Sequence, residues 1–84
     1  MSIQEHDLSN NELTKNFGTR LAFIRIKKSM TQEQLAEAAE ISTDFLSLIE
    51  RGLRAPSFLT LERLARALGV EVKELFIFDH MTDI

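Results

Sequence analysis

Apolar residues recur at helical spacing in the N-terminal third of the chain and form a single stripe. This stripe consists of Leu13, Phe17, Leu21 and Ile24. Residues three and four positions apart share one face of a helix, so the pattern predicts an amphipathic helix. Ser9 stands three residues before Glu12, as in a capping box, and Leu8 and Leu13 flank the cap as in a hydrophobic staple. The helix is therefore predicted to begin at Ser9 and to end near Lys28.

Two shorter helices follow, and each begins with its own capping signal. Thr31 and Gln34 form a second capping box. The apolar face of this helix is narrow and consists of Leu35, Ala36 and Ala39. Ser42 caps a third helix, which is predicted from Thr43 to about Arg51 and is ended by Gly52.

The C-terminal third contains a fourth helix and a short apolar segment. Ser57 caps the fourth helix and Gly69 ends it. A fifth, shorter helix is predicted from Val72 to about Phe78, where an apolar cluster stands. The cluster consists of Leu75, Phe76, Ile77 and Phe78. These elements predict an all-α fold, a bundle of five helices over residues 9–78, between flexible tails at residues 1–8 and 79–84.

Length and composition narrow the possible functions. The chain has 84 residues, 44% of them hydrophobic, which is enough for one core and too few for a two-domain enzyme. No Cys is present and His6 and His80 have no metal-ligand spacing, so neither a metal nor another cofactor is expected. Phosphate-loop and nucleophile motifs are absent, so we expect neither an enzyme nor a small-molecule ligand. Membrane-span and signal-peptide patterns are also missing, and the expected location is the cytoplasm.

The formal charge of −3 hides a strongly segregated pattern. Residues 15–28 carry +5, residues 29–50 carry −5 and residues 51–66 carry +3. Many of these charges suit helix ends or solvated helix faces. Glu50, however, lies close to the apolar stripe of the third helix and needs a cation if it is buried. Arg51 and Arg54 have no acid nearby, which fits either phosphate binding or a solvated surface.

The second and third helices, joined by residues 40–42, form a candidate helix-turn-helix. Four segments stand in order along the chain: Met30 to Ala36, Ile49 to Gly52, Pro56-Ser57, and Leu64 to Val70. With these segments, the chain from Phe17 to Phe76 resembles the XRE-type helix-turn-helix family, which includes phage repressors, Cro and restriction-modification controller proteins. This resemblance implies a lambda-repressor-like fold in which the third helix enters the DNA major groove.

The resemblance also implies roles for individual residues. Base contacts are expected from Thr43, Asp44, Ser47 and Leu48. Phosphate contacts are expected from Gln32, Arg51 and Arg54. Arg25 and Glu50 resemble an internal ion pair of the family, which supplies the cation that Glu50 needs.

The chain departs from the family pattern at the turn and on the third helix. Glu40 stands where most relatives have glycine, and a positive φ there costs about 1 kcal/mol. The residues expected to contact bases include no Arg, Lys, Asn or Gln, so the usual bidentate contacts to guanine and adenine are missing. Asp44 either accepts a hydrogen bond from cytosine or only favours the helix start, and Leu48 either touches thymine methyls or only packs. For Phe45 beside Leu48 we favour a core contact over an exposed patch for a partner.

The expected function is a DNA-binding transcriptional regulator that acts as a homodimer on a palindromic site of double-stranded DNA. The dimer interface is predicted to be Leu75, Phe76, Ile77 and Phe78, because one short helix cannot bury this cluster. The alternative is a protein-interaction module, antitoxin-like or anti-repressor-like, with weak DNA binding. The acidic third helix favours that alternative more than a basic helix would.

Overall fold

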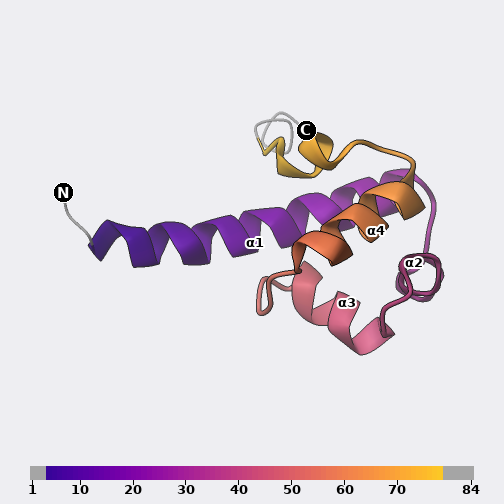
Figure 1. Cartoon of the computed structure of the whole chain (residues 1–84), viewed down its shortest axis with the longest axis horizontal. Coiled ribbons are helices and arrows are strands. Elements are labelled where there is room, and N and C mark those ends of the chain that lie inside the picture. Colours follow the sequence, from indigo (N-terminus) through magenta and orange to yellow (C-terminus); the bar gives the residue numbers. More distant parts are fainter. Residues whose placement is uncertain (1–3, 79–84) are drawn as a thin grey trace.

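The computed structural model describes the backbone of residues 4–78 and the side chains of residues 12–78. This part of the chain contains four α-helices and one short 3-10 helix, and no strand. The elements are α1 (Gln4–Lys27), α2 (Gln32–Ala39), α3 (Thr43–Glu50), α4 (Phe58–Leu68) and η1 (Val72–Phe76). The longest helix, α1, runs along the molecule, and its N-terminal half projects beyond the other elements (Figure 1). The predicted C-terminal tail, residues 79–84, lies outside the described residues.

The first helix begins earlier than the sequence predicted. It starts at Gln4, so Ser9 lies within the helix and the prediction that it is the N-cap was wrong. The predicted tail at residues 1–8 therefore overlaps α1. No glycine or proline precedes residue 18, and each added turn of a formed helix gains hydrogen bonds without a new nucleus. A capping pattern inside such a stretch does not stop the helix.

The other three helix starts are confirmed. The Ser42 and Ser57 side chains accept hydrogen bonds from the backbone N–H of Phe45 and Thr60 at 3.0 and 3.1 Å. Thr31 accepts from the backbone N–H of Gln34 at 3.0 Å, and the Gln34 side chain accepts from the Thr31 N–H at 2.8 Å. Each bond satisfies a backbone donor that the first helical turn leaves free. These caps fix where the second, third and fourth helices enter the bundle.

The core lies between α1, α2, α3, α4 and η1. The largest of the fully buried side chains are Leu21, Leu35, Leu46, Ile49, Leu64 and Leu75. Phe17, Ile24, Ala36 and Ala39 complete the predicted apolar faces of α1 and α2. Leu13, predicted to belong to the same stripe, is 48% exposed. The stripe of α1 is therefore buried only from Phe17 onward.

A close approach of α1 to α3 depends on Gly18. A β-carbon added at Gly18 would lie 2.2 Å from the carbonyl oxygen of Ile49 and 2.7 Å from that of Glu50. Both distances are far shorter than atoms tolerate, and both partners are backbone. This role of Gly18 is not predictable from the sequence, because a glycine inside a helix carries no periodic signal. Gly18 lets the last turn of α3 rest on α1.

The fifth predicted helix is a 3-10 helix of five residues, so the count of five α-helices is not confirmed. Glu71, at its N-cap position, makes no side-chain capping bond, and so short a segment gains few helical bonds. Its position is held instead by α1: Arg20 is only 6% exposed, and its Nε donates to the backbone oxygen of Glu74 at 2.9 Å. The sequence analysis counted Arg20 only as part of a basic block.

Candidate nucleic-acid interface

The helix-turn-helix consists of α2 and α3, and a buried network joins its two helices to α1. Arg25 Nε donates to Glu50 Oε2 at 2.7 Å, and Arg25 Nη2 to Glu50 Oε1 at 3.1 Å. The side chains are 13% and 6% exposed, so both charges are nearly removed from water. Arg25 Nη1 also donates to the Met30 carbonyl oxygen at 2.8 Å. One guanidinium thus holds the end of α3 and the entry to α2 together.

Gln32 belongs to the same network. Its Nε2 donates to Glu50 Oε1 at 2.8 Å, which fixes the side chain at the first position of α2. The second N–H of the amide remains as a donor, and the backbone N–H groups of the first turn of a helix favour an anion. Gln32 therefore lies at the N-terminus of α2, and its hydrogen bond to the Glu50 carboxylate fixes its side chain there.

We call the four residues predicted to contact bases the reading face; they are Thr43, Asp44, Ser47 and Leu48. They lie on the side of α3 opposite the buried residues Leu46 and Ile49. Asp44 is exposed, while the other three are half-buried. The capping bond of α3 comes from Ser42, and Asp44 makes no side-chain hydrogen bond within residues 12–78. Its carboxylate is thus directed to solvent, where only the helix dipole favours it.

The loop after α3 carries the two predicted phosphate contacts, Arg51 and Arg54, and both are exposed. Gly52 has a φ of +78°, and a β-carbon there would lie 2.9 Å from Cγ of Lys15. The loop therefore turns back against α1. The Arg54 guanidinium carbon lies 5.6 Å from the centroid of the Phe45 ring. Phe45 itself packs against the buried core, so the preferred interpretation of this residue is confirmed.

The turn between α2 and α3 is left-handed at Glu40, with a φ of +62° and a ψ of +41°. This is the position where the sequence analysis noted that a glycine is usual. The Glu40 N–H bonds to carbonyl oxygens at the end of α2, so the geometry ends the helix as a glycine would. The Glu40 carboxylate approaches Arg63 Nη2 at 3.8 Å, at the surface, where such a pair contributes little.

The predicted dimer interface is corrected at one position. Leu75 is fully buried in its own bundle, because η1 packs against α1 and α4, so it is not available to a partner. Phe76 is 38% exposed, and its ring lies 5.2 Å from that of Phe17, while Ile77 and Phe78 are half-buried. The 3-10 helix therefore divides the cluster between the core and the surface.

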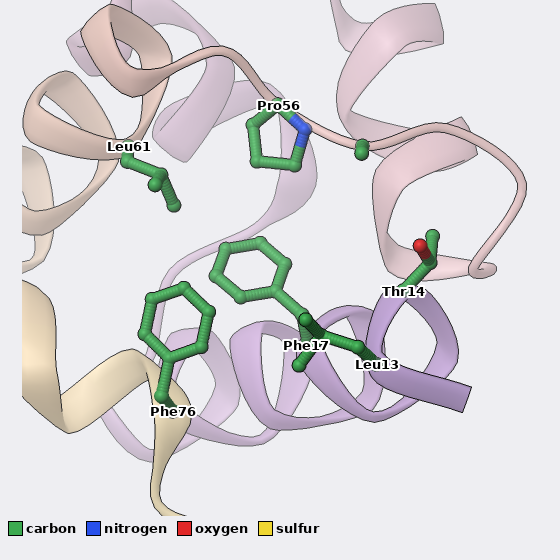
Figure 2. Close-up of a pocket in the computed structure, with 7 residues that line it drawn as sticks. Leu13, Thr14, Phe17, Pro56, Leu61 and Phe76 are labelled. Carbon is green, nitrogen blue, oxygen red and sulfur yellow. The ribbon is translucent and has the colours of Figure 1, made fainter. Parts of the chain in front are cut away.

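An apolar pocket opens beside Phe76. Figure 2 shows the Phe17 and Phe76 rings next to each other, with Pro56 and Leu61 facing them from the loop and α4. The pocket has a volume of about 180 Å³, and Leu13 stands at it with 48% of its surface exposed. Phe58, two residues after Pro56, is 85% exposed. The sequence analysis missed Leu13 and Phe58 as surface residues, since the first fits a core stripe and the second lies outside the predicted cluster.

With this geometry in place, the chain can be compared with known proteins. The helix-turn-helix family HTH_3 matches residues 21–75, which is most of the described chain. This protein is a member of the XRE-type helix-turn-helix family. The match covers the buried network, the reading face, both arginines of the loop and η1 up to Leu75, and it leaves out most of α1.

Relatives of this helix-turn-helix protein are transcriptional regulators. It is 39% identical to the control protein C.BamHI of Bacillus amyloliquefaciens over 69 residues, which are 81% of this chain and 85% of that one. It is 45% identical to the immunity repressor protein of Bacillus phage phi105 over 58 residues, 69% of this chain and 40% of that one. The fold matches the restriction-modification controller protein C.AhdI of Aeromonas hydrophila with a TM-score of 0.74 and 36% identity, over 75% of this chain and 96% of that one. No described helix is long and apolar enough to cross a membrane.

Proposed function

We propose that this protein is a sequence-specific, double-stranded DNA-binding transcriptional regulator. The observation that carries the proposal is the helix-turn-helix itself: a capped α2 and α3 with an unobstructed reading face, in a chain that belongs to a family of regulators. In such a motif the second helix lies in the major groove and its N-terminal residues contact base edges.

The reading face supplies the base contacts in this proposal. Asp44, exposed and without a protein partner among residues 12–78, accepts from cytosine N4. Thr43 and Ser47 donate to or accept from base edges, and Leu48 contacts thymine methyl groups. Because no side chain here makes a bidentate bond to guanine or adenine, each position discriminates less than an arginine or asparagine would.

Phosphate contacts are assigned to three residues that lie before and after the reading face in the sequence. Gln32 is fixed at the start of α2 by Glu50, and Arg51 and Arg54 lie in the loop after α3. We assign these three residues to the DNA backbone, where they set the register of α3 without carrying sequence information. The acidic residues of α2 and α3 reduce the non-specific attraction, so binding is modest and strongly dependent on salt.

Homodimerisation on a palindromic site completes the proposal. The support is the apolar surface at the pocket, where Leu13 and Phe76 are exposed beside Pro56 and Phe17, together with Phe58, which is exposed two residues after Pro56. An apolar surface of this kind on a small domain marks a contact site. In the proposed dimer, a two-fold contact places the two copies of α3 one turn of DNA apart, roughly 34 Å. Phe76, Ile77 and Phe78 keep the interface role predicted for them, and Leu75 does not. Sedimentation that shows only monomer at high micromolar concentration would contradict this part of the proposal.

Titration against random-sequence duplex DNA at several salt concentrations tests DNA binding. We expect the logarithm of the binding constant to fall with the logarithm of salt, by about 0.9 for each phosphate contact. Substituting Arg51→Ala lowers the slope by about one contact. The matched control is Lys73→Ala, an exposed cation of η1 that pairs with Glu71 at 3.6 Å and lies outside the helix-turn-helix. Selection of bound duplexes from a random pool then gives the site sequence.

A protein-interaction module is the second candidate. The observation that favours it is the composition of the reading face, which has an exposed acid and no cation. Absence of duplex binding even at low salt, in a protein that is folded and dimeric, would favour this candidate over the regulator.

A further inference from the structure

The Phe45 ring lies on a flank of α3, between its buried side and the reading face. Successive residues turn by about 100° around a helix, so Phe45 is offset from the buried Leu46 and Ile49 and lies next to Leu48. It is half-buried and packs against the core, which leaves one part of the ring at the surface. An aromatic face is thus presented beside the residues proposed to contact bases.

The guanidinium of Arg54 lies on this ring, with its central carbon 5.6 Å from the ring centroid. This is within the range of a favourable cation–π contact. Within the described chain it is the only side-chain interaction of Arg54. In the loop, the Leu53 N–H donates to the Leu48 oxygen at 2.9 Å. The next backbone–backbone hydrogen bond is made by the Ser57 oxygen, which accepts from the Leu61 N–H, so residues 54–56 make none. The ring therefore decides where the Arg54 side chain lies.

Stacking leaves the hydrogen-bonding capacity of the arginine intact. The five N–H donors of a guanidinium lie in its plane and point outward from the group, and a ring centred 5.6 Å from the central carbon is no conventional hydrogen-bond acceptor for them. We propose that Phe45 is a positioning residue that holds the Arg54 guanidinium beside the reading face, ready to donate to a DNA phosphate. This inference rests on the DNA-binding function proposed above. It couples a residue of the reading helix to a backbone contact, so that binding does not have to order a long, free side chain.

A second stacked ring in the molecule provides the comparison. Phe23 on α1 has Arg20 and Lys27 within 5.5 and 5.6 Å of its centroid. Arg20, however, is buried and donates to the Glu74 backbone oxygen, so its guanidinium serves the fold. Phe23→Leu therefore removes a ring beneath cations without touching the proposed interface, and it serves as a matched control.

The test is a double-mutant cycle on the full chain, with random-sequence duplex DNA as the probe. We expect Phe45→Leu to weaken binding roughly two- to fivefold when Arg54 is present. In the Arg54→Ala background the same substitution has no further effect. Phe45→Tyr keeps an aromatic face and binds as the unchanged protein does, and Phe23→Leu leaves affinity unaltered. All variants are measured at a temperature where circular dichroism shows them folded.

A readout without DNA separates this inference from the function on which it rests. In the free protein the ring current of Phe45 shifts the Arg54 side-chain protons upfield in the NMR spectrum, and Phe45→Leu abolishes the shift while Phe45→Tyr keeps it. Loss of affinity on Phe45→Leu that is equal in both Arg54 backgrounds would overturn the inference, and so would no loss at all. If the unchanged protein binds no DNA while the proton shift is present, the proposed function fails and the stack stands.

Discussion

Two largely buried arginines of α1 stabilise different parts of this protein. Arg25 bonds to the Glu50 carboxylate and holds the helix-turn-helix, whereas Arg20 bonds to a backbone oxygen and holds η1. They are five residues apart, so they point in directions that differ by roughly 140° around the helix. One long helix thereby supports the proposed DNA-binding unit on one side and the C-terminal segment on another. The partners differ in kind: Arg25 faces a carboxylate of opposite charge, while Arg20 faces a neutral carbonyl oxygen and the Phe23 ring.

The largest expected effect comes from removing the carboxylate of the first pair. Glu50→Ala leaves Arg25 buried without its counter-charge, and we expect the free energy of unfolding to fall by about 4 kcal/mol. Urea denaturation measures this change. As a control, the double variant Arg25→Met with Glu50→Leu removes both charges and is expected to be more stable than Glu50→Ala alone. A double variant that is less stable than the single one would show that the charge is not what matters at this site.

Gly18 lies seven residues before Arg25 and therefore on the same face of α1. Substituting it tests how closely this face packs against α3. Gly18→Ala places a methyl group against the Ile49 and Glu50 carbonyl oxygens, which must move. We expect a loss of about 3 kcal/mol in unfolding free energy, at the upper end for overpacking, together with weaker DNA binding. The matched control is Ala22→Gly, one turn further along α1, which creates no overlap and costs about 1 kcal/mol through helix propensity. Equal effects of the two changes would contradict the close approach.

Substitution of the second arginine sharpens the comparison. Arg20→Met keeps much of the aliphatic volume and removes the bond to the Glu74 oxygen, so we expect a loss of about 2 kcal/mol. DNA affinity should stay the same at a temperature where the variant is folded and at a protein concentration where sedimentation shows it dimeric, since η1 is not part of the helix-turn-helix. Parallel denaturation and duplex titration measure both quantities. A loss of DNA affinity in the folded, dimeric Arg20→Met variant would show that the two sides of α1 are not independent.

The smallest expected change stabilises the helix-turn-helix without involving Arg25. Glu40→Gly removes a side chain from a left-handed backbone position, and we expect a gain of about 0.5–1 kcal/mol. The gain is limited because glycine also raises the entropy of the unfolded chain. Thermal and urea denaturation both report it. Gly69, which ends α4 with a φ of +73°, provides the reverse control: Gly69→Ala should be destabilising by a similar amount.

The sequence predicted this fold well where caps and periodicity agree. Ser42, Ser57 and the Thr31–Gln34 box all begin helices, because a capping side chain bonds to a backbone donor within three residues of itself. The prediction failed at Ser9, where the same pattern lies inside a helix that no glycine or proline interrupts before residue 18. It failed again at the fifth helix, because a segment of five residues takes its geometry from the elements around it.

The candidate site was predicted residue by residue from the family resemblance, and its base and phosphate contacts remain predictions. The sequence did not predict that Gln32 bonds to Glu50, that Arg54 lies on Phe45, or that Arg20 holds η1. These contacts join residues 18, 9 and 54 positions apart, and no local pattern links positions at such distances. Leu75 was misassigned for the same reason. An apolar cluster predicts that its side chains need burial, but not which of them is buried in the core of its own chain.

By itself the sequence determined helices α2, α3 and α4 with their caps, most of the buried stripes, the segregated charge and the family. The helices, caps and stripes depend on side chains within one or two turns of each other, so local interactions decide them. Only the tertiary structure decided which buried arginine serves which part of the molecule. It also decided how closely α1 approaches α3 at Gly18 and which apolar residues remain exposed around the pocket. The physical reason is that hydrogen-bond partners, close backbone contacts and burial depend on atoms that are distant in sequence and meet only after the helices have packed.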